Sequence, residues 1–148
     1  MTVDKIEQTI DLPFSQDRVW RAITSPEELS RWFGDKITLE PAVGSDINFI
    51  WHEHGTSSGK VEVYDPPSRF AYRWRAHGVE ESEPMASDNS TLVTFTLTPT
   101  AEGTRLDLLE IGFASLRESV RAISLQENTS GWRTELGELV EYLEQVVQ

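Results

Sequence analysis

The chain has 148 residues, 38% of them apolar and 26% charged, which is typical of one compact domain, so we expect a single domain over residues 1–148. Its 25 acidic and 13 basic residues give a formal net charge of −12, which repels phosphate groups and argues against nucleic acid or an anionic membrane as a partner. The sequence has no cysteine, no run of the roughly 20 apolar residues that a bilayer requires and no signal-peptide pattern, so we expect a cytoplasmic protein without disulfides.

Two short helices are predicted after a first strand near residues 4–11. Ser15 is placed to cap the first helix, just before the apolar residues that begin at Val19. Residues 25–28 (SPEE) combine an N-cap serine, a first-turn proline and an acidic residue at the third helical position. The second helix carries an apolar stripe that must pack against another layer, formed by Leu29, Trp32 and Phe33.

The middle of the chain is predicted to form strands, because apolar and polar residues alternate there between turn clusters. The six expected strands lie near residues 36–40, 46–52, 57–65, 68–75, 91–99 and 104–111. Turn residues at 65–68 (DPPS) and 101–103 (AEG) indicate antiparallel hairpins between the strands that they connect. Residues 76–90 show no periodicity and are expected to form a surface loop.

One face of the predicted sheet is apolar. The side chains expected on it are Ile47, Phe49, Trp51, Phe70, Tyr72, Trp74, Val93, Phe95, Leu97, Leu106 and Leu108. In the last strand the same alternation places Glu110 on the inner face, because the charged residues Arg105 and Asp107 occupy the other one. A carboxylate is therefore expected inside the protein.

A long amphipathic helix is predicted at the end of the chain. Apolar residues recur there at helical spacing, namely Trp132, Leu136, Leu139, Val140, Leu143 and Val146. Upstream, Ser115 and Glu118 form a capping box that predicts a helix over residues 116–126. Residues 128–131 (NTSG) weaken helix propensity without forbidding it, so the sequence leaves open whether the two helices are one.

This order of elements, together with a set of spaced residues, resembles a known family. The matching positions are Pro13, Val19-Trp20, Ile23-Thr24, Pro26-Glu27, Trp32-Phe33, Gly59, Asp65-Pro66-Pro67, Tyr72, Trp74, residues 91–97, Gly103-Thr104, Gly112-Phe113 and Gly131-Trp132. The chain resembles the helix-grip, START-like (SRPBCC) proteins, in the branch related to the C-terminal domain of the activator of heat-shock protein 90 ATPase. The resemblance implies an α+β fold in which a curved antiparallel sheet of about seven strands grips the C-terminal helix. It also implies a cavity between sheet and helix, which in this superfamily commonly accepts hydrophobic small molecules.

The inner face is unusually aromatic, and we expect it to line that cavity. The candidate ligand-binding residues are Trp32, Phe33, Trp51, Trp74, Phe95, Phe113, Trp132 and Leu136. Of these, Trp32, Phe33 and Phe113 are expected nearest to the mouth. Buried rings are ordinarily core material, so a purely structural role is the alternative interpretation of each.

Glu110 is the candidate catalytic residue. An unpaired carboxylate in apolar surroundings should have a raised pKa or a bound partner, and it can act as a general acid or base or hold a ligand hydroxyl or amine. The alternatives are a surface position, or an ion pair with Arg73 or Arg75 across the sheet. In the family Glu110 occupies a position, two before Gly112, at which relatives often carry histidine or another polar group.

Metal and cofactor sites are not expected. His52 and His54 alternate in a strand and share a face, but no third ligand follows at a recognisable spacing. The sequence has no nucleophile elbow and no glycine-rich phosphate loop. Neither a metal nor a cofactor is therefore predicted.

Three functions remain open from the sequence. The first is binding of a hydrophobic small molecule between the sheet and the C-terminal helix, with Glu110 contacting its polar end. The second is an enzyme resembling the polyketide cyclases and aromatases of the superfamily, in which Glu110 moves a proton. The third is an interaction module that works beside a chaperone, which would need an exposed apolar patch instead of an internal cavity.

Overall fold

The structure is a computed structural model that describes residues 4–53 and 55–145. Its sheet has seven strands, all antiparallel, in the order β1-β7-β6-β5-β4-β3-β2. The strands are β1 (Lys5–Leu12), β2 (Lys36–Leu39), β3 (Asp46–Trp51), β4 (Gly55–Asp65), β5 (Arg69–Arg75), β6 (Ser90–Pro99) and β7 (Thr104–Ile111). The predicted meander is confirmed, and β1 pairs with β7 as the edge strand of the sheet.

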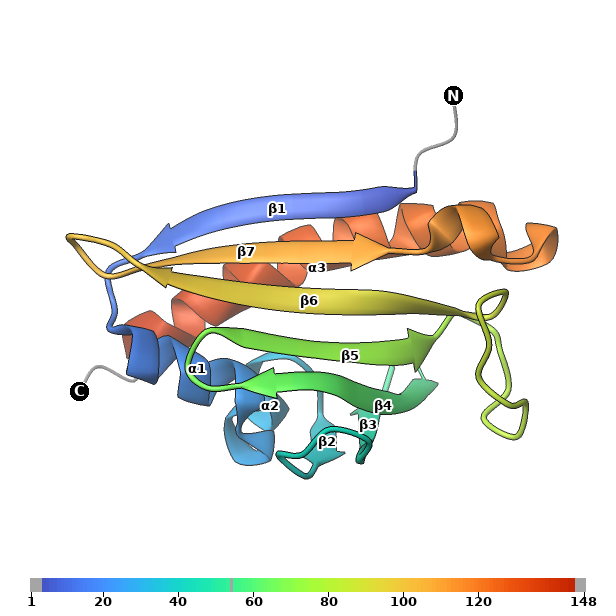
Figure 1. Cartoon of the computed structure of the whole chain (residues 1–148), viewed down its shortest axis with the longest axis horizontal. Helices are drawn as coiled ribbons and strands as arrows, with labels where there is room; N and C mark the ends of the chain where they lie inside the picture. Colours follow the sequence, from blue (N-terminus) through green and yellow to red (C-terminus); the bar gives the residue numbers. More distant parts are fainter. Residues whose placement is uncertain (1–3, 54, 146–148) are drawn as a thin grey trace.

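Helices cover one face of this sheet. Figure 1 shows the long α3 (Glu118–Gln145) running along that face, while α1 (Gln16–Thr24) and α2 (Pro26–Trp32) contact α3, and α2 also contacts β2. The connection between β5 and β6 lies at the opposite end of the strands from α1 (Figure 1). The predicted helix-grip fold is confirmed.

Both short helices begin at the serines that the sequence indicates. The Ser15 hydroxyl accepts a hydrogen bond from the Arg18 amide at 3.2 Å, and the Ser25 hydroxyl accepts one from the Glu28 amide at 3.4 Å. Each cap satisfies an amide that has no partner within its helix. Ser25 also ends α1, so the chain turns directly from one helix into the next.

The start of the C-terminal helix differs from the prediction. Ser115 belongs to a short 3-10 turn, η1 (Phe113–Ser115), and Leu116 is extended, so the capping box does not form and α3 begins at Glu118. The cause lies in the backbone, where Gly112 has a φ of +107° and directs the chain into η1. The helix then continues without a break through residues 128–131, which answers the question that the sequence left open.

Packing on the sheet accounts for this continuity. The buried side chains of Trp132, Leu136, Leu139 and Leu143 hold α3 against the inner face, which outweighs the weak propensity of residues 128–131. Val146, the last apolar residue of the predicted stripe, lies outside the described residues. Near its C-terminal end, Tyr142 donates a hydrogen bond of 2.8 Å to Glu28, which also pairs with Arg18 at 2.7 Å. Three helices thus meet at one carboxylate.

The space between sheet and helix is filled with side chains. Phe49, Phe70, Leu108 and Leu139 are all at most 1% exposed. The cavity among the core side chains around Tyr72 has a volume of about 10 Å³, which is room for one water molecule at most. The enclosed cavity that the resemblance implies is therefore absent from this part of the core.

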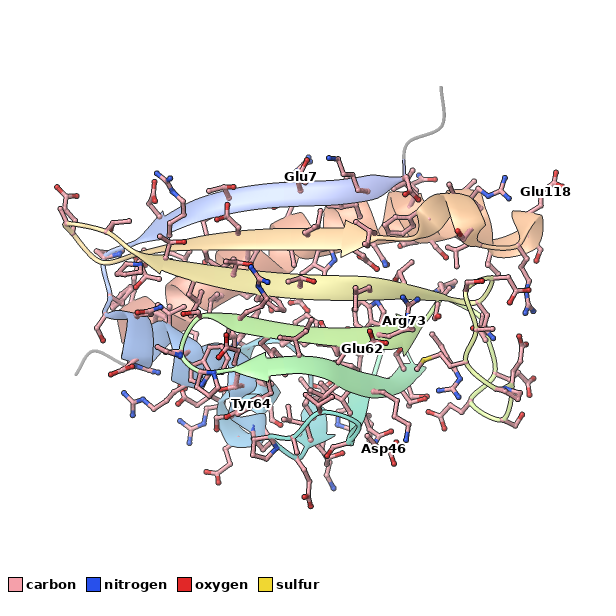
Figure 2. The ribbon with its side chains drawn as sticks, in the orientation of Figure 1. Glu7, Asp46, Glu62, Tyr64, Arg73 and Glu118 are labelled. Atoms are coloured by element: carbon pink, nitrogen blue, oxygen red, sulfur yellow. The ribbon has the colours of Figure 1, made fainter. Side chains whose placement is uncertain are left out.

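The other face of the sheet is polar. Figure 2 labels Glu62 and Arg73 beside each other on neighbouring strands, and the Arg73 Nε lies 3.3 Å from a Glu62 carboxylate oxygen. Close to this pair, β4 and β5 approach so tightly that a Cβ at Gly59 would lie 1.8 Å from the Arg73 carbonyl oxygen. Only glycine fits there, which explains one of the residues that the family pattern contains.

Candidate functional site: an aromatic cleft beside the C-terminal helix

A cleft of about 980 Å³ opens at one end of the core. Its walls come from the end of α2, the strand ends around Trp51 and Trp74, the first part of the connection between β5 and β6, and one face of α3 between Glu127 and Glu138. The cleft begins where the packed core ends, so it lies between sheet and helix only at this end. It is open to solvent, in contrast to the enclosed cavity expected from the sequence.

Five aromatic side chains line this cleft, namely Trp32, Phe33, Trp51, Trp74 and Trp132. Phe33 stands at their centre. Its ring stacks on Trp132 with centroids 5.4 Å apart and planes 14° apart, and it meets the edge of Trp51 at 5.7 Å. The Trp74 ring lies 5.8 Å from Trp132 and 6.3 Å from Phe33, so these three rings all contact one another. Such contacts fix the rings in place, so the wall is formed before any ligand arrives.

Hydrogen bonds also hold each indole. Trp32 donates its Nε1–H to the Ala22 carbonyl at 2.8 Å, and Trp51 donates to the Phe33 carbonyl at 2.7 Å. Trp74 and Trp132 both donate to a side chain behind the wall, Glu110. Every indole of the wall is therefore oriented through its own N–H.

Glu110 is fully buried on the inner face of β7, as the alternation predicts. One carboxylate oxygen accepts from Trp132 at 2.7 Å. The other accepts from Thr91 at 2.6 Å, from Asn128 at 2.9 Å and from Trp74 at 3.0 Å. The predicted alternatives, a surface position or an ion pair with Arg73 or Arg75, are wrong.

The environment of Glu110 acts on its pKa in two opposite ways. Burial raises the pKa above its ordinary value, and the hydrogen bonds from Thr91, Trp132, Trp74 and Asn128 lower it, with burial the larger effect. Glu110 itself does not line the cleft, whereas three of its donors do. In this geometry the carboxylate holds Trp74, Asn128 and Trp132 in position from behind.

A pair of carboxyl groups, separate from Glu110, faces the cleft directly. Glu135 and Glu138 lie three residues apart on α3 and both line the opening. Burial, with the neighbouring Glu138 carboxyl, raises the pKa of Glu135 to about 9, and the nearby Trp51 side chain opposes this only in part. With no cation in the cleft, the Glu135 side chain is therefore mainly a neutral acid at neutral pH.

Comparison with known proteins places this fold in a family. Residues 13–144 match the family model described as "Activator of Hsp90 ATPase homolog 1-like protein". The chain belongs to this family. No curated protein sequence matches the chain closely enough to assign it further.

Solved structures of similar fold span nearly the whole of this family member. The protein MLL2253 from Mesorhizobium loti is 24% identical, with a TM-score of 0.81, and the match covers 97% of this chain and 99% of that one. The Aha1 dimer from Colwellia psychrerythraea is 21% identical, with a TM-score of 0.77 and coverage of 96% and 97%. PFC0360w, an HSP90 activator from Plasmodium falciparum, is 17% identical, with a TM-score of 0.75 and coverage of 96% and 97%. At these identities the likeness concerns the fold.

Three of the eight predicted ligand-binding residues lie away from the cleft. Phe95 packs among core rings beside the small void, and Leu136 is buried on the sheet side of α3. Phe113, which was expected near the mouth, is fully buried in η1, so that expectation is wrong. The turn at Gly112 moves Phe113 under the start of α3, and this turn depends on one φ angle that alternation does not reveal.

The sequence analysis missed Asn128, Glu135 and Glu138. A helical wheel groups them on one face of the helix, because Asn128, Gly131, Glu135 and Glu138 recur at helical spacing. Their polarity made them look like the solvent face of an amphipathic helix. Only the position of the cleft shows that this face also borders an opening.

The other expectations concern metals and membranes. Within residues 4–53 and 55–145, no three side chains of the metal-binding types come together, and His54 lies outside these residues, so the predicted His52 and His54 pair is not described. Among the helices described, none combines the length and the apolar character that crossing a membrane requires.

Proposed function

We propose that this protein binds a hydrophobic small molecule with an aromatic portion in the cleft beside α3. The observation that carries the proposal is the cleft itself, whose volume of about 980 Å³ is at the upper end of the roughly 300–1,000 Å³ usual for ligand sites. Five aromatic side chains line it, and a flat apolar ligand can stack on Trp51, which is half-buried, whereas the other four rings are buried behind it.

The aromatic wall is arranged before binding. Trp32, Trp51, Trp74 and Trp132 each donate an indole hydrogen bond to the protein, so a ligand need not order them. Preorganisation reduces the entropy lost on binding. This supports a binding role for Trp51, which is half-buried at the opening and is held in place by the buried rings behind it.

In this proposal Glu110 is a positioning residue. Its carboxylate already accepts four hydrogen bonds and lies behind Trp74 and Trp132. A polar group of a ligand in the cleft would therefore meet Asn128, which lines the opening, before it met Glu110. The cyclase-like alternative requires direct contact between Glu110 and the substrate, and this geometry gives it less support.

The family name also suggests a role beside a chaperone, since the relative from Plasmodium falciparum is described as an HSP90 activator. Such a role needs an apolar docking patch. In the described part of the chain, the exposed large apolar residues are Val43 in the connection between β2 and β3, Ile111 at the end of β7 and Ile123 on α3. The cleft is thus the better supported interaction site.

A cleft-filling variant tests the proposal. Gly131 lines the cleft, and a Cβ placed there meets no atom within 4 Å, so the side chain of a Gly131→Leu variant starts in open space. Gly137→Leu on the same helix is the matched control, because Gly137 is equally unobstructed but does not line the cleft.

Native mass spectrometry of freshly purified protein, followed by a fragment screen, provides the measurement. We expect a co-purified or screened aromatic compound to bind the wild type and the Gly137→Leu variant, and to bind the Gly131→Leu variant at least about tenfold more weakly. Equal binding by all three proteins would place the ligand elsewhere and refute the proposal.

A further inference from the structure

The charged side chains of the cleft are mostly acidic. Its lining includes five of them, Asp35, Glu80, Glu127, Glu135 and Glu138. The lining also contains two arginines, Arg31 and Arg75, and one histidine, His77. A concave site lined mainly by one sign of charge raises the local concentration of ligands of the opposite sign. The net charge of −12 acts in the same direction.

The guanidinium of Arg75 is occupied within the protein. It donates to the Ser58 hydroxyl at 2.8 Å and to the Glu83 carbonyl at 3.1 Å. Neither Glu135 nor Glu138 forms an ion pair with any residue that the structure describes. These two carboxyls therefore lie beside each other in a half-enclosed opening without a positive charge between them.

Aromatic rings lie close to this acidic pair. Trp51, whose side chain partly offsets the raised pKa of Glu135, lines the same opening. Its ring packs edge-on against Phe33. The π face of an aromatic ring attracts cations, and Trp is the strongest of the natural side chains in this respect. A carboxylate pair next to an indole is a combination that suits an organic cation and disfavours an anion.

We propose that the ligand of this cleft is a hydrophobic amine, whose aromatic body stacks on the partly exposed Trp51 ring and whose ammonium group binds between Glu135 and Glu138. This inference rests on the proposed function and names the class of ligand that the same cleft selects. A bound cation favours the ionised form of both carboxyls, so it would lower the raised pKa of Glu135. An isosteric neutral ligand would keep the stacking and lose this contact.

Three indole compounds of nearly equal size test the charge selection. Tryptamine carries an ammonium group, tryptophol a neutral hydroxyl and indole-3-acetate a carboxylate. Isothermal titration at neutral pH and low salt should show that tryptamine binds at least about tenfold more tightly than tryptophol, with indole-3-acetate weakest. Added salt should reduce the preference for tryptamine, because screening weakens half-exposed charge contacts.

Paired variants test the residues. Glu135→Gln combined with Glu138→Gln should lower tryptamine affinity by about tenfold and leave tryptophol affinity unchanged. The control is Glu141→Gln combined with Glu144→Gln, which makes the same pair of substitutions at the same spacing on α3, at exposed positions outside the cleft. The control should keep the full preference for tryptamine, and circular dichroism checks that both proteins are folded.

The outcomes separate the inference from the proposed function. If tryptophol binds in the cleft as tightly as tryptamine, or if the Glu135 and Glu138 variant keeps the preference, the inference is overturned while the binding function stands. If none of the three probes binds, the inference is overturned as well, and the Gly131→Leu comparison decides the proposed function separately.

Discussion

The indole nitrogen of Trp132 donates a hydrogen bond of 2.7 Å to the carboxylate of Glu110, which joins the middle of α3 to the inner face of β7. Through the same carboxylate, Trp74 on β5 and Thr91 on β6 are tied to the helix. Three neighbouring strands and α3 therefore share one buried acceptor. The wall of the cleft depends on it, because two of the indoles in that wall point their N–H groups at Glu110.

We predict that Glu110→Ala destabilises the protein by about 3–5 kcal/mol, since it leaves four hydrogen-bond donors without their acceptor. Glu110→Gln should cost less, about 1–3 kcal/mol, because the amide oxygen can replace one carboxylate oxygen while the amide nitrogen faces a donor. Urea unfolding measures both changes. A loss below about 0.5 kcal/mol for Glu110→Ala would show that the network contributes little.

Replacing Glu135 should change how stability depends on pH. The pKa of Glu135 is raised from 4.5 to about 9 in the folded protein, so between these values the folded state holds a proton that the unfolded chain has lost. The unfolding free energy should therefore fall as the pH rises from about 4.5 to about 9. The stability that the proton on Glu135 contributes is fully present only below this pH range. Glu135→Gln should remove this part of the decrease.

Solvent exposure of Glu135 limits how much its titration changes the unfolding free energy. A fully buried group would contribute about 1.4 kcal/mol per pH unit, and we expect a fraction of that because the Glu135 carboxyl is only partly buried. The measurement is the difference between wild type and variant in urea unfolding across the window. The pKa of Glu110 is also raised, but Glu110 is present in both proteins, so its effect on stability cancels in the difference. Parallel curves for the two proteins would contradict the assigned pKa.

The two unobstructed glycines of α3 offer a gain in stability. Gly131→Ala and Gly137→Ala each replace a glycine in a helix interior, where a Cβ meets nothing within 4 Å. Each should raise the unfolding free energy by about 0.5–1 kcal/mol. Thermal unfolding followed by circular dichroism measures it. A destabilisation by either substitution would mean that α3 is not a continuous helix at that point.

Gly59→Ala should have the opposite effect. Its Cβ would overlap the Arg73 carbonyl oxygen, and backbone rather than a flexible side chain would have to move. We expect a loss of about 1–3 kcal/mol or more, with Gly137→Ala as the control for replacing glycine where space exists. A neutral result at position 59 would contradict the close approach of β4 and β5.

Much of the fold could be predicted from local sequence. The alternation of β5, β6 and β7 is visible because one face of the sheet is buried and the other is wet, and it correctly places even a charged residue, Glu110, inside. The caps at Ser15 and Ser25 form as their sequences indicate, because a serine hydroxyl needs only its own helix to act.

The remaining features depend on tertiary packing. Ser115 and Glu118 have the sequence of a capping box, but the positive φ of Gly112 places Ser115 in a turn. The helix therefore starts at Glu118 instead of residue 116. Glu135 and Glu138 look like solvent-facing residues until the cleft is known. Whether side chains fill the space between sheet and helix depends on their volumes and rotamers, which periodicity does not report.

The five tryptophans of the chain give the most direct test of ligand binding in the cleft. Four of them line the cleft, whereas Trp20 packs on Tyr64 and Phe70 away from it. In ¹⁵N-labelled protein each indole N–H gives its own NMR signal. Titration with an indole-based amine should shift the signals of Trp51, Trp74 and Trp132 and leave Trp20 unchanged. Five unchanged signals, or a Trp20 shift as large as the others, would contradict binding at this site.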